Sequence, residues 1–258
     1  MADQNENLLH GEQDTVMIYF NPELIQTLAD RSAEKRQNFR ELLSAAEDGD
    51  LDAAYRLAQN YRAGEDGAPE DPEQAFRWFA RAAEGDHVAA QFALGQCYAR
   101  GFGTEKDVDK ALELFTAGAE LGYLPAVCEL GLCYELGQGV EMDKLRAAEL
   151  YREAAEQDFA PAQCNLGFFY YRGIGVEEDD SQAAAWFARS AQQDYPRAQL
   201  LMGECYENGY GVEQDAEKAV ALYRAAHQQD YSAGTCALGV CYDRGFGVEE
   251  DHQQAAAL

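Results

Sequence analysis

Residues 125–160, which read PAVCELGLCYELGQGVEMDKLRAAELYREAAEQDFA, decide the fold of this chain. The apolar residues of the first part recur at the spacing of one face of a helix, i, i+4, i+7, i+8 and i+11: Ala126, Leu130, Cys133, Tyr134 and Gly137. Gly137 and Gly139 end this helix, because glycine readily adopts the left-handed conformation that satisfies the last carbonyl groups. We call the predicted helix that ends at Gly137 helix A.

The second part of the stretch carries another amphipathic pattern. Asp143 supplies a side-chain oxygen that can cap the first amides of a helix. The apolar residues that follow lie at i, i+3, i+4, i+7 and i+8: Ala147, Leu150, Tyr151, Ala154 and Ala155. We call this predicted helix B. Because one pair of helices is too small to bury both apolar stripes, such hairpins must stack on one another.

The whole pattern recurs with a period of 36 residues. A helix A tyrosine and the first turn glycine mark five copies: Tyr98, Tyr134, Tyr170, Tyr206 and Tyr242, with Gly101, Gly137, Gly173, Gly209 and Gly245. An earlier copy fits if its turn holds one extra residue. We expect repeats to start near residues 53, 90, 126, 162, 198 and 234, the last repeat being incomplete.

A glycine inside helix A recurs with the same period. Gly131 would cost about 1 kcal/mol relative to alanine in a helix interior. Its counterparts are Gly95, Gly167, Gly203 and Gly239. This recurrence predicts a close approach between helices at that position, which a side chain would prevent.

The pattern Ala-x-x-x-Leu-Gly-x-x-Tyr-x-x-Gly-x-Gly-Val-x-x-Asp-x-x-x-Ala resembles the Sel1-like repeat, a relative of the tetratricopeptide repeat. The resemblance covers residues 53–258 and departs from the pattern locally, as at Ala58, which replaces the helix A glycine of the first copy. It implies an all-α fold, an α-solenoid with a right-handed superhelix of about 5.5 helical hairpins. It also implies a non-enzymatic scaffold or adaptor that binds a protein or peptide on its concave face.

The two ends of the chain lie outside complete repeats. We expect residues 1–20 to be disordered or extended, and residues 21–52 to form N-terminal capping helices, with one helix from Pro22 and another from Ser32 to Asp48. Leu258 falls at a core position of the sixth copy. We therefore expect the array to continue beyond this residue or another surface to cover it. The protein is then a monomer, or it self-associates through this uncapped C-terminal end.

The charge of the chain excludes several partners. It holds 20 Lys and Arg against 47 Asp and Glu, a formal net charge of −27, which repels phosphate backbones and anionic membrane surfaces. We expect no nucleic acid and no membrane as partners, and a protein partner that is neutral to basic. Since the sequence shows no membrane-spanning run and no secretory signal, we expect a cytoplasmic protein.

No catalytic, cofactor or metal site is expected. The seven cysteines form two columns of the repeat, with no CxxC motif and no Cys/His pairing at zinc-ligand spacing: Cys97, Cys133, Cys205 and Cys241 in one, Cys128, Cys164 and Cys236 in the other. The four histidines share neither a helix face nor metal-ligand spacing, and we expect His87 and His227 at the surface. Small buried apolar side chains explain the cysteines best.

The candidate binding residues are those that the repeat does not fix. In tetratricopeptide-like arrays helix A lines the concave face, and this register places eight residues of interest there: Phe92, Arg100, Leu132, Leu136, Phe168, Tyr171, Arg172 and Arg244. Such a groove could hold an apolar or aromatic peptide segment while the guanidinium groups pair with its carboxylates. Alternatively, the aromatic residues tighten the packing and the arginines pair with acidic neighbours.

Two other functions stay open. Some cysteine-rich relatives in this family bind or hydrolyse β-lactams, yet those proteins are secreted and use paired disulfides, which this chain does not show. The array could also be a regulatory or sensory module of a longer protein. Turnover of a β-lactam by the pure protein would separate the first of these functions from a scaffold.

Overall fold

The structure, a computed structural model, describes residues 22–258, with side chains from residue 33 onward. That part of the chain is built from thirteen helices and no strand: α1 (Pro22–Glu47), α2 (Leu51–Ala63), α3 (Pro72–Glu84), α4 (Val88–Arg100), α5 (Val108–Glu120), α6 (Leu124–Leu136), α7 (Lys144–Glu156), α8 (Ala160–Arg172), α9 (Asp180–Ala191), α10 (Pro196–Asn208), α11 (Ala216–His227), α12 (Ser232–Arg244) and α13 (His252–Ala257). The predicted helices A are the even-numbered helices from α2 to α12, and the predicted helices B are the odd-numbered helices from α3 to α13.

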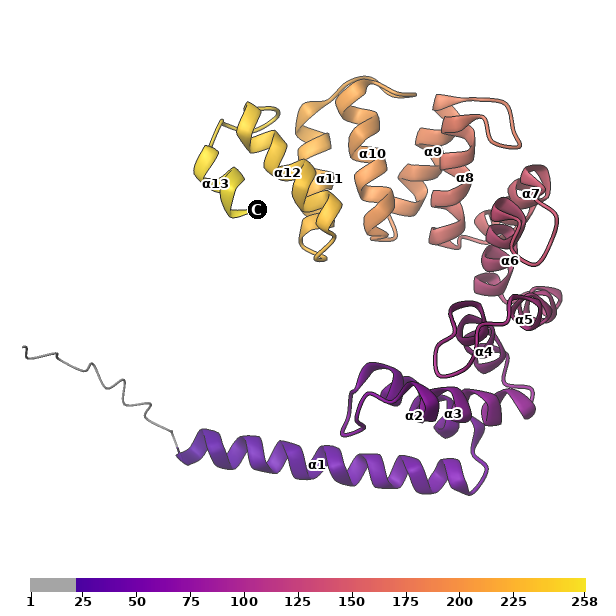
Figure 1. Cartoon of the computed structure of the whole chain (residues 1–258). Coiled ribbons are helices and arrows are strands. Elements are labelled where there is room, and N and C mark those ends of the chain that lie inside the picture. Colours follow the sequence, from indigo (N-terminus) through magenta and orange to yellow (C-terminus); the bar gives the residue numbers. More distant parts are fainter. Residues whose placement is uncertain (1–21) are drawn as a thin grey trace, which may run out of the picture.

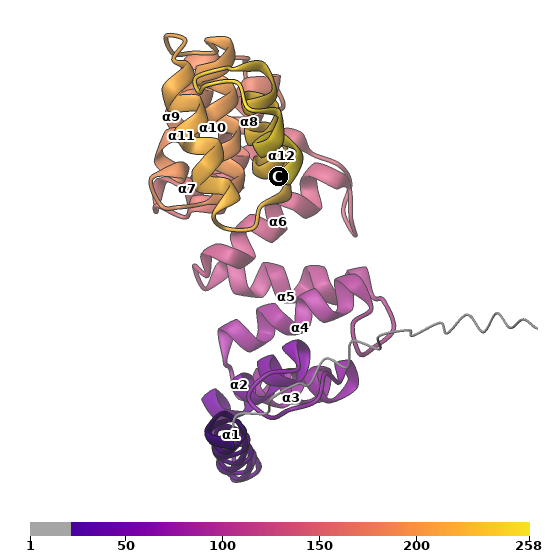
Figure 2. The same ribbon diagram turned by 90° about the vertical axis from the view of Figure 1, so that its left-hand side faces the viewer.

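The hairpins stack in chain order and form an open arc (Figure 1). Each helix packs against the next one along the chain, and α10 also contacts α12. Seen at right angles, α1 lies at one end of the stack beside α2 and α3, and α12 lies at the other end (Figure 2). The predicted α-solenoid of helical hairpins is confirmed. No helix within residues 22–258 combines the length and the apolar character that crossing a membrane requires.

The turn between the two helices of a hairpin is built as its residues predict. Gly137 ends α6 in the left-handed conformation, with φ 68°, and its amide donates to the carbonyl of Cys133. The side chain of Asp143 accepts a hydrogen bond from the amide of Arg146 and so begins α7. Aspartate caps helix B in the same way in all six hairpins: Asp71, Asp107, Asp143, Asp179, Asp215 and Asp251.

Four of the five helix A glycines, all except Gly239, mark a close approach between the two helices of one hairpin, as predicted. A Cβ atom on Gly131 would lie 2.8 Å from Cε1 of Tyr151, and one on Gly167 would lie 2.7 Å from Cδ1 of Phe187. These distances are shorter than any relaxed contact, so the aromatic ring of helix B fills the space that a side chain would need. The buried rings of this column are Phe79, Phe115, Tyr151, Phe187 and Tyr223.

The second turn glycine joins neighbouring hairpins. A Cβ atom on Gly175 would overlap the carbonyl oxygen of Lys144, at the start of helix B in the preceding hairpin. Gly103, Gly211 and Gly247 face the preceding helix B in the same way. This glycine therefore sets the distance between successive hairpins, whereas the helix A glycine sets the distance within one.

The N-terminal segment differs from expectation. We expected two helices, but α1 runs unbroken from Pro22 to Glu47. No glycine or proline lies between residues 23 and 47, so nothing in the sequence ends a helix there. The last part of α1 packs on the first hairpin, where the rings of Phe39 and Tyr61 meet edge to face at 5.8 Å. The expectation for residues 1–20 falls outside the described residues.

The last helix, α13, packs on α12 and has no buried residue. Leu258 is half-buried and packs against the core cluster that contains Tyr223 and Leu238. Whether the array continues or is covered at this end stays a prediction.

Candidate functional site

All eight candidate binding residues lie on helices A, and four of these helices carry them. Phe92 and Arg100 belong to α4, Leu132 and Leu136 to α6, and Arg244 to α12. The other three, Phe168, Tyr171 and Arg172, belong to α8. In the middle of the stack, α4 and α6 lie toward the open side of the arc, and α5 and α7 lie toward its outer side (Figure 1).

Phe168 takes part in a contact chain across three helices A. The Cζ atom of Arg197, on α10, lies 5.7 Å from the centroid of the Phe168 ring. Arg197 also donates from Nη1 to Oδ1 of Asn165 at 2.7 Å, and Asn165 donates from Nδ2 to Sγ of Cys128 at 3.6 Å. The half-buried Phe168 is therefore packed against Arg197 of α10, and the hydrogen bonds of Asn165 link α8 to both α6 and α10.

Sequence reasoning missed Arg197 and Asn165. Arg197 stands in the column of Pro125 and Pro161, and Asn165 stands in the column of Glu129. Asn165 lies one helical turn before the candidate Phe168, and Arg197 lies one turn before Leu200. The 36-residue period therefore contains a signal that places both residues near the helix A face. The structure adds these two residues to the helix A face.

The other candidate aromatic residues also pack internally. The rings of Tyr171 and Tyr210 lie 5.6 Å apart, and Phe92 packs against both Phe115 and Tyr123. Burial raises the pKa of the Tyr171 hydroxyl. These contacts give the aromatic candidates a packing role between neighbouring helices and turns.

The aliphatic candidates are more accessible. Leu136 is 50% exposed at the end of α6, and Leu132 is half-buried one turn before it. The helix A face thus includes an exposed apolar side chain on α6, and Arg172 is exposed at the end of α8, the next helix A. The structure does not gather all eight candidates into one cluster, because Arg100 and Arg244 lie on α4 and α12, which α5 to α11 separate along the stack.

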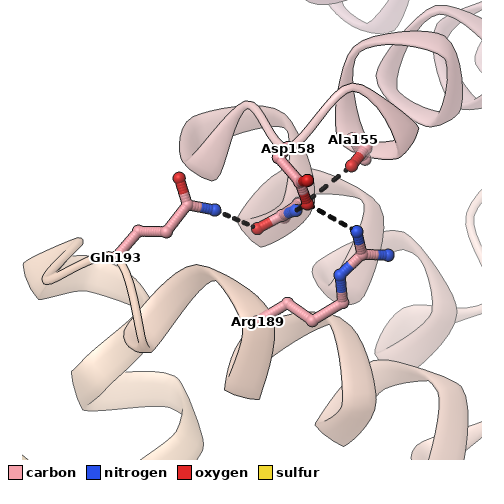
Figure 3. A network of polar contacts seen from close by, with 5 residues as sticks. Ala155, Asp158, Arg189 and Gln193 are labelled. Atoms are coloured by element: carbon pink, nitrogen blue, oxygen red, sulfur yellow. Dashed lines mark hydrogen bonds and ion pairs between the residues drawn. The ribbon is translucent and has the colours of Figure 1, made fainter.

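The three candidate arginines have no acidic partner in the described part of the chain. Arg100, Arg172 and Arg244 are exposed, and none of them forms a hydrogen bond or ion pair with a described residue. Arg189 on helix α9 behaves differently, because its Nη2 atom pairs with Oδ1 of Asp158 at 2.6 Å (Figure 3). The expected alternative, pairing with acidic neighbours, is therefore absent for these three within residues 33–258, whose side chains the structure describes.

Arg100 lines a pocket that the sequence did not reveal. The pocket measures about 220 Å³ and lies between α2 and α4; its lining residues are Arg62, Ala93, Gln96, Cys97, Arg100 and Phe102. Arg62 is exposed, and its Cζ atom lies 5.7 Å from the centroid of the Phe79 ring. Burial raises the pKa of the Cys97 thiol to about 11, and the positive charges of Arg62 and Arg100 oppose that rise.

The position of Arg62 has a different use in later hairpins. Its counterparts Glu135 and Glu207 accept hydrogen bonds from the hydroxyls of Tyr151 and Tyr223, at 2.7 and 2.6 Å. Burial, and then this hydrogen bond, raise the pKa of both tyrosines. Where the buried ring is phenylalanine, as at Phe115 and Phe187, the matching helix A residue is Ala99 or Tyr171. Glutamate therefore accompanies tyrosine because a buried hydroxyl needs an acceptor.

A second polar network ties neighbouring hairpins together. Gln193 donates to Oε1 of the buried Gln163 at 2.8 Å, and Gln163 donates to the carbonyl of Ala155 and to Asp158 (Figure 3). Gln229 and Gln199 repeat the first of these bonds one period later. Gln91 holds the same position in the second hairpin, but its buried Oε1 atom accepts no hydrogen bond from any residue that the structure describes. Residue 121, which would supply the donor, is leucine.

The structure corrects the expectation for two histidines. His87 and His227 are half-buried and not fully exposed. His87 accepts a hydrogen bond at Nδ1 from the amide of Ala90 and so caps α4, and its Nε2 atom lies 3.1 Å from Asp52. His227 bonds to the hydroxyl of Thr235 at 2.9 Å. Both rings thus have structural roles at helix ends.

All seven cysteines, which fall within the described residues, are free thiols. Burial raises the pKa of six of them, to about 11 or 12, whereas Cys236 is exposed. Among the side chains that the structure describes, no three histidine, cysteine, aspartate or glutamate residues are grouped so that they could hold a metal ion. The buried cysteines serve as small core residues.

Comparisons with solved structures support the fold. A Sel1 repeat protein from Oxalobacter formigenes is 30% identical, with a TM-score of 0.75, over 86% of this chain and 96% of that one. A protective antigen of uropathogenic Escherichia coli strains that displays an SLR fold is 31% identical, with a TM-score of 0.68, over 85% of this chain. The match spans 47% of the antigen, about half its length. An immunity protein of Pseudomonas aeruginosa shares the fold at 20% identity, with a TM-score of 0.56, over 83% of this chain and 85% of that one.

No curated protein matches the chain. The family model of the Sel1 repeat matches six consecutive segments: residues 51–87, 88–123, 124–159, 160–195, 196–231 and 232–258. These segments begin at the first residues of the six helices A. They account for the whole stack of hairpins that follows α1. The chain therefore belongs to the Sel1 repeat family.

Proposed function

We propose that this protein is a non-enzymatic scaffold or adaptor that binds a protein or peptide partner on the face formed by its helices A. Sel1 repeats commonly mediate protein–protein interactions. One observation carries the proposal: Arg100, Arg172 and Arg244 project from this face without an acidic partner among the described residues. In a chain of net charge −27, unpaired exposed arginines are available for a partner's carboxylates.

Apolar side chains on the same face support the proposal. Leu136 is 50% exposed and Val240 is 43% exposed, and both lie on helices A. Exposed aliphatic groups beside arginines suit a peptide that alternates apolar and acidic residues. The partner as a whole is neutral to basic, because the long-range field of this chain repels a strongly acidic protein.

A cytoplasmic location is part of this proposal. The described cysteines are all unpaired, as is usual in a reducing compartment. The unpaired cysteines do not support the alternative function, binding or hydrolysis of β-lactams, because the cysteine-rich relatives with that activity use paired disulfides. A regulatory module of a longer protein would use the same helix A face, with its activity in another domain.

Quantitative affinity capture tests the proposal. The test variant carries Arg100→Gln, Arg172→Gln and Arg244→Gln. The control variant carries Arg77→Gln, Arg146→Gln and Arg224→Gln, which remove the same charge from exposed arginines of helices B. Mass spectrometry with isotope labels then compares the partners that each variant retains.

We expect the control variant to retain the partner of the wild type and the test variant to lose it by tenfold or more. Equal retention by the two variants would show that the helix A arginines do not bind the partner. Equal loss would show that only the overall charge matters. Thermal unfolding of both variants confirms that each is folded.

A further inference from the structure

The pocket between α2 and α4 has an unusual charge. Two arginines, Arg62 and Arg100, line it together with Gln96. Neither guanidinium forms an ion pair with a described residue. Three apolar groups complete the lining: Ala93, Cys97 and Phe102.

The repeat provides an internal comparison for this pair of arginines. Arg62 belongs to the first hairpin and Arg100 to the second, and the corresponding pairs at the next four junctions are Ala99 with Leu136, Glu135 with Arg172, Tyr171 with Asn208, and Glu207 with Arg244. At two later junctions the chain thus places a glutamate, Glu135 or Glu207, at the position of Arg62, and its carboxylate accepts a hydrogen bond from a buried tyrosine hydroxyl. At the first junction it supplies a second arginine in that place.

The environment of one cysteine column shows the same contrast. Burial raises the pKa of Cys97 and of Cys241 to about 11. Arg62 and Arg100 both oppose the rise at Cys97, whereas at Cys241 the negative charge of Glu207 adds to it and Arg244 opposes it. The residue at the position of Arg62 therefore carries opposite charge at the two junctions. The first junction has two positive charges and no carboxylate to balance them.

We propose that the pocket at the first junction binds a carboxylate joined to a small aliphatic group, as a C-terminal aliphatic residue of a partner chain presents them. The two guanidinium groups and the Gln96 amide provide the donors for the carboxylate. The apolar part of the lining and a volume of about 220 Å³ fit an aliphatic side chain of leucine size. This inference rests on the proposed function, since the pocket lies on the helix A face.

The probe is N-acetyl-L-leucine, which carries both parts of the ligand. Its titration is followed in pure, isotope-labelled protein by the NMR signals of the Arg62 and Arg100 Nε–H groups and of the Gln96 side-chain amide. We expect saturable shifts with a dissociation constant on the order of 1 mM, as is usual for a ligand of this size. N-acetyl-L-leucinamide, which lacks the charge, should bind at least tenfold more weakly.

Variants separate the pocket from the general charge of the face. Arg62→Gln and Arg100→Gln should each weaken binding of N-acetyl-L-leucine by tenfold or more. The matched control is Arg56→Gln, which removes the same charge from an exposed arginine of α2 that lies outside the pocket, and it should leave binding unchanged. Thermal unfolding of each variant shows whether it is folded. The comparison of N-acetyl-L-leucine with N-acetyl-L-leucinamide uses the wild-type protein, so it tests the proposal even if a variant does not fold.

Three results would overturn the proposal. The first is the absence of saturable shifts, and the second is equal binding of the acid and the amide. The third is tighter binding of inorganic phosphate than of N-acetyl-L-leucine, which would indicate a plain anion site without an aliphatic part. If the helix A face captures a partner but the protein does not bind N-acetyl-L-leucine, the proposed ligand of the pocket is wrong and the proposed scaffold function still holds. If the protein binds N-acetyl-L-leucine but captures no partner, the ligand of the pocket is supported and the proposed scaffold function is wrong.

Discussion

The first junction between hairpins and the later junctions differ on a shared backbone. Arg62 and Arg100 line one pocket at the first junction. At the junction between the third and fourth hairpins, Glu135 and Arg172 occupy the same two positions of the repeat. Glu135 accepts a hydrogen bond from the buried Tyr151, whereas Arg62 forms no hydrogen bond or ion pair with a described residue and its Cζ atom lies 5.7 Å from the centroid of the Phe79 ring. The acidic position thus serves the fold in the later hairpin. In the first hairpin the same position is left available for a ligand.

In this chain the positions that hold the fold recur in nearly every repeat, whereas the positions available for binding differ from one repeat to the next. Core columns, caps and turn glycines are the same in nearly every copy because each hairpin must stack on the next. The residues of the helix A face vary, and a polar side chain there either meets a buried group of its own hairpin or stays unpaired. The unpaired ones are the candidates for binding.

The largest expected effect concerns the burial that all junctions share. Cys97 lies beneath the first junction and Cys241 beneath the last, and burial raises the pKa of each thiol from 9.0 to about 11. The folded chain therefore holds these protons at a pH where the unfolded chain releases them, and stability falls as the pH rises from 9 toward 11. Six buried thiols make the total loss several kcal/mol, at about 1.4 kcal/mol per thiol and pH unit.

Urea unfolding under reducing conditions at pH 8, 9.5 and 10.5 measures this loss. A midpoint that stays constant across the range would contradict the burial of the thiols. The exposed Cys236 supplies the control, because its replacement by serine should leave the pH dependence unchanged.

The next largest effect comes from replacing Glu135, the acidic residue of a later junction. Glu135→Leu leaves the hydroxyl of the buried Tyr151 without its acceptor, which lowers the free energy of unfolding by about 1–3 kcal/mol. Glu135→Gln keeps an acceptor oxygen and should cost less. Urea unfolding compares the two variants, and equal stability of both with the wild type would show that the hydrogen bond does not matter.

A transplant of this pair sharpens the comparison. Phe115→Tyr places a hydroxyl where Ala99 offers no acceptor, so it should destabilise the second hairpin by about 1–2 kcal/mol. Adding Ala99→Glu recreates the pair of the later hairpins and should restore most of that loss. A double-mutant cycle measures the coupling, and a coupling energy of zero would contradict the assignment of tyrosine and glutamate as one unit.

The smallest effect is a gain. Leu121→Gln places a donor at the position of Gln193, where it can reach the buried Oε1 atom of Gln91. Leu121 is 66% exposed, so its removal costs little, and the new hydrogen bond should raise the free energy of unfolding by about 1 kcal/mol. The control Leu121→Glu offers no donor, and a gain as large as that of glutamine would contradict the explanation.

The sequence predicted the hairpins, caps and close glycines because these depend on local spacing and recur in every copy. It did not predict the continuous α1, because Ser32 is a residue type that can begin a helix, although no glycine or proline lies between residues 23 and 47. It also missed Arg197 and the pairing of Tyr151 with Glu135. Period and spacing show which residues share a face. How two helices cross, and which side chains of adjacent helices then meet, depends on tertiary packing.

The central claim is that unpaired arginines on helices A bind the partner. The most direct measurement compares the amount of partner retained by a variant with Arg100→Gln, Arg172→Gln and Arg244→Gln with that retained by a variant with Arg77→Gln, Arg146→Gln and Arg224→Gln, at equal ionic strength. The account predicts that the first variant retains less than a tenth of the partner retained by the second. Equal retention by the two variants would contradict it.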